Sequence, residues 1–245
     1  MLEKKIIDMV EKLRLASQNM PKVWKGRESI LEMKDADFKQ WRQVEWLDSY
    51  FKFLCQKHFD GIIEMLGQRY GNMRSDAFCE ISWDFKAHAA NTTSYNIVAN
   101  DVETITNAIR NYSYCGIILA IGNVEYDKDK TFKRWHDELR KETCEYETNR
   151  ISTGVMSQTR KTAFVLEEIH FICFDNKTLD KCCGILQDSF GDTGSKLKRQ
   201  EIIIDIRKIP NASVVATKIF YGKVGYDSKF QYGTRRLKLK YNLLT

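Results

Sequence analysis

The chain has 245 residues, of which 43% are hydrophobic and 29% are charged, with a formal net charge of +6. This composition suits a globular protein with a substantial core and excludes an intrinsically disordered chain. Apolar runs stay short of the roughly 18 residues that span a membrane, and no apolar leader follows the charged N-terminus. The seven cysteines include no CxxC pair, so we expect a reducing, cytoplasmic location and no structural zinc site of the usual spacing.

The excess positive charge lies in the last quarter of the chain. Residues 186–245 carry 12 Lys or Arg and 5 Asp or Glu, whereas the remaining residues have a balance of −1. Such asymmetry is typical of a surface that binds a polyanion, and it is equally compatible with a solvated basic face. Charge alone leaves both interpretations open.

The first predicted elements in chain order are helical. Apolar residues recur at helical spacing within 1–20, and Pro21 ends that element. A long helical pattern runs over 35–66, where Gly61 offers a break. The segment 67–75 is rich in turn residues and predicts a connector.

A strand, a helix and a second strand are predicted next. Apolar and polar residues alternate over 81–86, as on a half-buried strand, and Asn100 or Asp101 is placed to cap a helix across 101–112. The continuous apolar run 115–122 is typical of a buried parallel strand. This order requires a crossover and predicts an α/β fold with a central mixed β-sheet flanked by helices. Later strands are predicted at 167–175, 201–206 and 217–221.

The segment Asp84-Phe85-Lys86 is the strongest pointer to chemistry. On a strand, residues i and i+2 share a face at roughly 6.5–7 Å. This spacing suits metal-dependent hydrolysis of a phosphodiester: Asp84 could hold Mg²⁺, while Lys86 could orient or deprotonate the attacking water or stabilise negative charge on the phosphate. The bare pattern also occurs at Glu3-x-Lys5 and Glu32-x-Lys34, in leader or helical segments where the side chains diverge. An exposed ion pair on a strand is the alternative interpretation.

With its upstream acid and its downstream helix and buried strand, the motif resembles the PD-(D/E)xK nuclease superfamily, and within it the type II restriction endonucleases. The resemblance covers residues 76–122: Ser75-Asp76 stands in place of Pro-Asp, and Asp84-Phe85-Lys86 in place of acid-x-Lys. It implies a restriction-endonuclease-like core with catalytic Asp76, Asp84 and Lys86, and with Mg²⁺ on Asp76 and Asp84. A more distant family feature is an acid on an early helix, which Glu45 could supply as a metal ligand.

The spacing of the two acids departs from the usual family pattern. Asp76 and Asp84 are eight positions apart, at the short end for this family. On one straight strand they would lie about 26 Å apart, too far to share a metal. The chain must therefore turn between them, although residues 77–82 contain no Gly or Pro. Glu80 and Glu45 remain alternatives for the second acid.

Several polar and basic residues are candidates for DNA contacts. His88 and the polar loop that follows could touch phosphate or bases, and a solvated surface loop is the alternative. Elsewhere, Arg, Asn and Gln suit base edges, whereas clustered Lys and Arg suit phosphates. The predicted DNA-binding residues are His88, Asn91, Thr92, Asn149, Arg150, Arg160, Lys161, Lys198, Arg199, Arg235 and Arg236.

These features predict a single nuclease domain over 1–245, with a helical N-terminal part (1–66), a catalytic core (67–185) and a basic C-terminal part facing DNA (186–245). We expect a type II restriction endonuclease that uses Mg²⁺ to cut double-stranded DNA at a short sequence. A homodimer is expected, because two-fold symmetry matches a palindrome. A repair or junction nuclease with the same core and a non-catalytic DNA-binding protein are the alternatives.

Overall fold

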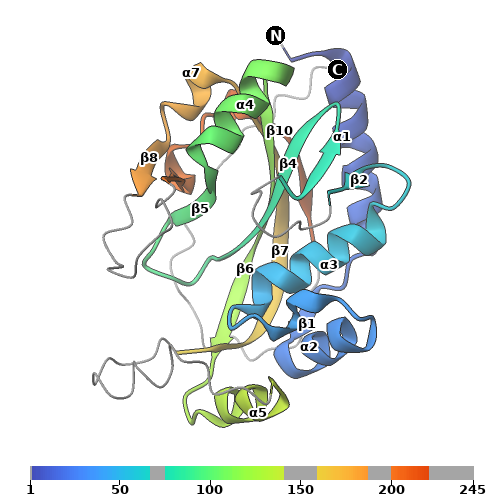
Figure 1. Ribbon diagram of the computed structural model, residues 1–245, viewed down its shortest axis with the longest axis vertical. Helices are drawn as coiled ribbons and strands as arrows, with labels where there is room; N and C mark the ends of the chain where they lie inside the picture. Colours follow the sequence, from blue (N-terminus) through green and yellow to red (C-terminus); the bar gives the residue numbers. More distant parts are fainter. Residues whose placement is uncertain (1, 67–74, 141–158, 187–199, 221–245) are drawn as a thin grey trace, which may run out of the picture.

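The computed structural model describes residues 2–66, 75–140, 159–186 and 200–220 (Figure 1). These segments contain both helices and strands, with short 3₁₀ turns between several of them. In chain order they are α1 (Lys4–Ala16), β1 (Val23–Lys25), α2 (Gly26–Asp35), α3 (Trp46–His58), β2 (Glu64–Met65), β3 (Ala77–Cys79), β4 (Ile81–Ala89), β5 (Asn96–Asp101), α4 (Val102–Tyr112), β6 (Cys115–Tyr126), α5 (Thr131–Arg140), β7 (Lys161–Phe174), α7 (Asn176–Leu179), β8 (Cys183–Leu186), β9 (Glu201–Asp205) and β10 (Val214–Ile219).

A seven-stranded mixed sheet runs through the centre of the described structure. Its order is β1-β7-β6-β4-β3-β2, and β10 also pairs with β7. Strands β4 and β6 are parallel, whereas the other pairs in this sheet are antiparallel. Helix α4 lies in the crossover between the parallel strands (Figure 1). The predicted α/β fold, with a mixed sheet flanked by helices, is therefore confirmed.

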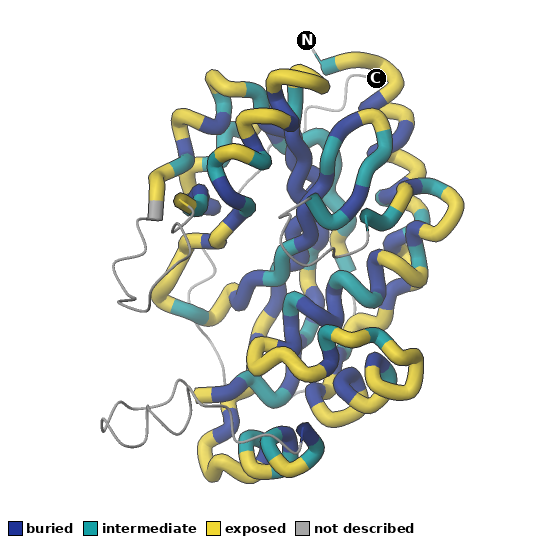
Figure 2. The backbone as a smooth tube through the Cα atoms, viewed as in Figure 1, coloured by how far each residue is buried: buried dark blue, intermediate teal, exposed yellow. Residues whose placement is uncertain are grey.

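The two faces of this sheet bury different sets of residues. Trp83 and Phe85 of β4 point into the larger core, which the sheet forms with α1, α2 and α3. On the opposite face, Ile117 and Leu119 of β6 pack against α4 and a three-stranded sheet of order β5-β9-β8. Because β4 pairs in register with β6, with Asp84 beside Ile117 and Lys86 beside Leu119, these two polar residues share the second face. Figure 2 shows the buried backbone concentrated along the central strands.

The expected long helix over 35–66 is wrong. Helix α2 ends at Asp35, and the αL residue Asp37 (φ 54°) lets the Phe38 N–H donate to the Met33 carbonyl at 2.8 Å. This is a Schellman-type stop, and it usually uses Gly or Asn, so the sequence carried no clear signal for it. The next helix, α3, begins only at Trp46.

The N-terminal part is also less helical than expected, because β1 and β2 both join the central sheet. Neither these strands nor α2 and β5 were predicted. The helix cap was placed correctly: the Asp101 carboxylate accepts from the Thr104 N–H at 2.9 Å and starts α4. The three later strands were found as β7, β9 and β10, with β7 beginning six positions earlier than predicted. Among the helices of the described segments, none is long and apolar enough to cross a membrane.

Candidate active site

A tight turn at Glu80 brings the two predicted acids together. Glu80 has a φ of 60°, a left-handed conformation that a glutamate rarely adopts, and it reverses the chain between β3 and β4. The antiparallel register pairs Ala77 with Trp83, so Asp76 lies across from Asp84. The Asp76 N–H donates to Asp84 Oδ1 at 3.3 Å. The required turn is therefore present without Gly or Pro.

Carboxylates occupy the free edge of β4 beyond the end of β3. The Phe85 N–H donates to Asp76 Oδ2 at 2.8 Å, and the Ala87 N–H donates to Asp48 Oδ1 at 2.6 Å. These bonds satisfy backbone donors that would otherwise be unpaired at a strand edge. They also fix Asp76 and Asp48 against the strand that carries Asp84 and Lys86.

Asp84 is the most strongly perturbed group of this cluster. Its side chain is buried, and its Oδ1 accepts from Asn100 Nδ2 at 3.3 Å as well as from the Asp76 N–H. Burial, followed by the negative charge of Asp76, raises the pKa of Asp84 to about 6, despite the opposing effects of Lys86 and Lys52. Perturbation by burial together with a specific charged neighbour is typical of functional sites.

Lys86 lies on the same face of β4 as Asp84, as the alternation over 81–86 predicts. Its Nζ donates to the Ala99 carbonyl at 3.3 Å, a long bond that leaves the ammonium two further donors. The Lys86 charge also acts on Asp48: burial raises the pKa of the Asp48 carboxyl, and the Lys86 charge is the largest opposing influence. The Lys86 charge thus acts on two buried carboxylates, those of Asp48 and Asp84.

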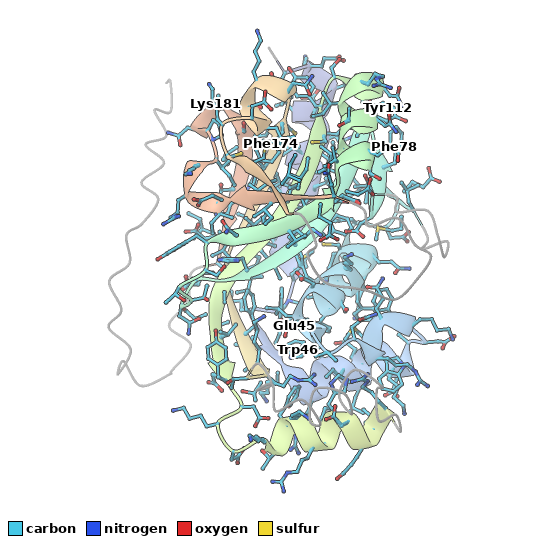
Figure 3. All side chains as sticks on the ribbon, turned by 60° about the vertical axis from the view of Figure 1, so that its left-hand side comes forward. Glu45, Trp46, Phe78, Tyr112, Phe174 and Lys181 are labelled. Atoms are coloured by element: carbon cyan, nitrogen blue, oxygen red, sulfur yellow. The ribbon has the colours of Figure 1, made fainter. Side chains whose placement is uncertain are left out.

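Asp48 is a site residue that sequence reasoning missed. The early-helix acid was assigned to Glu45, but Glu45 only precedes the first turn of α3 and forms an ion pair with Lys161. Figure 3 shows Glu45 and Trp46 far below Phe78 and Tyr112, which mark the β3–β4 hairpin and α4. The available signal was an acid inside the apolar run Trp46-Leu47-Asp48-Ser49-Tyr50, because a buried carboxylate requires a partner.

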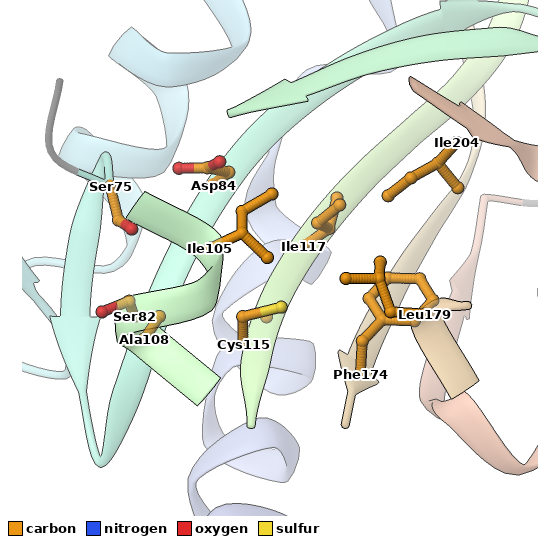
Figure 4. Close-up of a pocket in the computed structure, with 11 residues that line it drawn as sticks. Ser75, Ser82, Asp84, Ile105, Ala108, Cys115, Ile117, Phe174, Leu179 and Ile204 are labelled. Atoms are coloured by element: carbon orange, nitrogen blue, oxygen red, sulfur yellow. The ribbon is translucent and has the colours of Figure 1, made fainter. Parts of the chain in front are cut away.

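A small pocket lies beside this cluster, between the central sheet, α4 and the second sheet. Asp84, Ser82 and Ser75 form its polar side, and apolar residues such as Ile117 and Ile204 form the remainder (Figure 4). The apolar walls keep one side of Asp84 dry, which accounts for the burial that raises its pKa.

The other sequence candidates near this strand have mixed surroundings. His88 lies on β4 itself and is 8% exposed, and its Nε2 has no hydrogen-bond partner among the described residues. Burial lowers the pKa of His88. Asn91 is bound at both ends of its amide, donating to the Val124 carbonyl and accepting from the Val124 N–H, each at 2.9 Å. Thr92 Oγ1 accepts from the Ser94 N–H at 3.4 Å.

The remaining basic candidates are only partly described. Arg160 is 8% exposed; it donates to the Val44 carbonyl at 3.1 Å and lies 3.6 Å from Asp137. Lys161 pairs with Glu45. The Lys161 charge also acts on Asp48 and on His88. The candidates that lie outside the described residues are Asn149, Arg150, Lys198, Arg199, Arg235 and Arg236.

The donor set fits a hard divalent cation. Asp76 and Asp84 are neighbouring carboxylates whose mutual repulsion a cation would relieve, and Mg²⁺ prefers oxygen ligands while keeping several waters. The two bonds to Asp84 Oδ1 are 3.3 Å long, so exchanging them for a cation costs little. Within the described segments, no group of three or more His, Cys, Asp or Glu side chains is arranged to hold a metal. Asp76 and Asp84 would hold such a cation together with water molecules.

Comparison of the chain with models of protein families, with curated proteins and with solved structures gave no match.

Proposed function

We propose that this protein is a Mg²⁺-dependent endonuclease of double-stranded DNA, with Asp76, Asp84 and Lys86 as its catalytic residues and a restriction-endonuclease-like core. The observation that carries the proposal is the β3–β4 hairpin. It places Asp76 across from Asp84, while Lys86 shares the face of Asp84. A structural ion pair on a strand does not require a buried carboxylate whose pKa is raised by a second carboxylate.

The protein's own residues divide the work of phosphodiester hydrolysis. Asp76 and Asp84 would hold Mg²⁺, and bound Mg²⁺ supplies Lewis-acid chemistry at a phosphate. The Lys86 ammonium, with donors to spare, would orient the attacking water and stabilise negative charge on the phosphate. Asp48 fixes the edge of β4 through the N–H of Ala87, the residue next to Lys86.

Sequence specificity would come from residues outside this catalytic group. Cutting at a short specific sequence, as a type II restriction endonuclease, would use the basic C-terminal part and a homodimer on a palindrome. A repair or junction nuclease would use the same three residues with a different DNA-binding surface. A non-catalytic DNA-binding protein would have no use for the buried carboxylate pair.

The test is incubation of the protein with phage DNA and Mg²⁺, followed by gel electrophoresis. Discrete fragments support restriction, whereas a smear or cutting of junctions only supports the repair alternative. Intact DNA with a mobility shift refutes catalysis and leaves a binding protein.

Substituted proteins in the same assay test which residues are catalytic. Asp84→Ala and Lys86→Ala are expected to lower the cutting rate by a factor on the order of 10² or more. Lys57→Ala, an exposed lysine on α3 that pairs with Glu32, is the matched control and should cut at the wild-type rate. Wild-type rates for both Asp84→Ala and Lys86→Ala would show that the assignment is wrong.

A further inference from the structure

A lysine on α3 reaches into the carboxylate pair. Lys52 Nζ lies 2.8 Å from Asp76 Oδ1, and the two side chains are only 20% and 16% exposed. Burial lowers the pKa of Lys52, but the charges of Asp76, Asp84 and Asp48 outweigh it and the net pKa is raised. The ammonium thus serves as counter-charge to the whole acidic cluster.

Both oxygens of Asp76 are engaged in this arrangement. Oδ2 accepts from the Phe85 N–H, and Oδ1 is paired with Lys52. Each oxygen keeps a further lone pair, so a divalent cation could bind Asp76 through either one, but at both it would lie close to the Lys52 ammonium. Two cations at contact distance from one oxygen repel each other strongly, even at an effective dielectric constant near 20.

We propose that Lys52 is a positioning residue and a resident counter-ion of the metal site: it holds Asp76 opposite Asp84 in the metal-free protein, and a divalent cation must compete with its positive charge for Asp76. This inference rests on the proposed function, because it concerns the same two carboxylates. The Lys52 ammonium lowers the cation affinity of the site below that of a carboxylate pair with no ammonium beside it. The same charge keeps Asp76 and Asp84 together when no metal is bound.

The long, flexible side chain of lysine suits this role. Lys52 lies on α3, which also carries Asp48 one turn earlier and packs against β4. Helix α3 therefore presents an acidic and a basic residue, Asp48 at i and Lys52 at i+4, to the edge of β4. Where a cation displaces it from Asp76, the ammonium stays near the site, and Asp48 remains a neighbouring negative charge.

The experiment is a calorimetric titration of the full chain with Ca²⁺ and Mn²⁺ in the absence of DNA, which reads binding and not cleavage. Lys52→Met and Lys52→Gln remove the charge, and Lys52→Gln also keeps a polar group for Asp76, which guards against a folding defect in the other variant. The dissociation constant is expected to fall at least about tenfold in both. Lys52→Arg keeps the charge and should stay near the wild-type value. Lys57→Met, on the exposed side of the same helix, is the matched control.

Thermal melting in EDTA and in Ca²⁺ gives a second measurement. Without metal, Lys52→Met should melt below wild type, because Asp76 loses its counter-charge; with saturating Ca²⁺ the difference should close. Unchanged or weaker binding in both neutral variants, with binding still lost in Asp84→Asn, would overturn the role of Lys52 and leave the nuclease proposal standing. Wild-type protein that binds no cation, or Asp84→Asn that binds as well as wild type, would overturn the metal site and the Lys52 proposal with it.

Discussion

Replacing Asp84 with Asn should stabilise the metal-free protein while destroying its activity. The folded structure raises the pKa of this buried carboxyl from 3.8 to about 6. A tenfold change in an ionisation constant corresponds to about 1.4 kcal/mol, so keeping Asp84 ionised in the folded state costs about 3 kcal/mol at neutral pH. Asparagine keeps an oxygen for the Asn100 amide and the Asp76 N–H, and it carries no charge.

The pH dependence follows from the direction of the change. Between the ordinary pKa and about 6, the folded protein keeps a proton that the unfolded chain releases. Wild-type stability should therefore fall as pH rises through this window and level off above it. The Asp84→Asn variant lacks this decline, so its advantage should be close to zero near pH 4 and approach about 3 kcal/mol at pH 8.

Urea denaturation in EDTA at several pH values measures this difference directly. Glu138→Gln, which changes an exposed carboxylate on α5, is the control and should show no such pH-dependent gain. A lower stability of Asp84→Asn than of wild type at pH 8, or an advantage that does not shrink at low pH, would refute the raised pKa of Asp84. Adding Mg²⁺ should reverse the order, because only wild type keeps both acids for the cation.

Two further predictions concern the framework of the site. Glu80 adopts a φ of 60°, so Glu80→Gly should raise stability in urea by up to about 1 kcal/mol, offset in part by the lost pair with Lys5. Glu80→Pro, whose ring fixes φ near −65°, should open the hairpin and lower both stability and cation binding. Gly116 lies beside Trp83, and an added Cβ would meet Trp83 Cε3 at 2.3 Å; Gly116→Ala should therefore cost about 1–3 kcal/mol in thermal or urea unfolding. Equal stability of the Gly116→Ala variant and wild type would show that the strand can shift to accommodate the methyl group.

The elements predicted best were those whose signal is local. The alternation over 81–86 placed Asp84 and Lys86 on one face of a strand, and the apolar run after residue 114 placed the neighbouring parallel strand. The Asp101 cap could be predicted because a short polar side chain just before an amphipathic helix commonly accepts a hydrogen bond from a backbone N–H of the first turn. Periodicity failed over 35–66, where an unusual residue in the αL conformation ends a helix.

The sequence by itself determined the class of fold and the strand that places Asp84 and Lys86 on one face. Tertiary structure alone decided which acids meet. The turn at Glu80 gives no compositional signal, because a glutamate in the left-handed region is held there by the pairing of β3 with β4. Asp48 and Lys52 reach the site from a helix distant in sequence, and the spacing of residues along a chain contains no information about that packing.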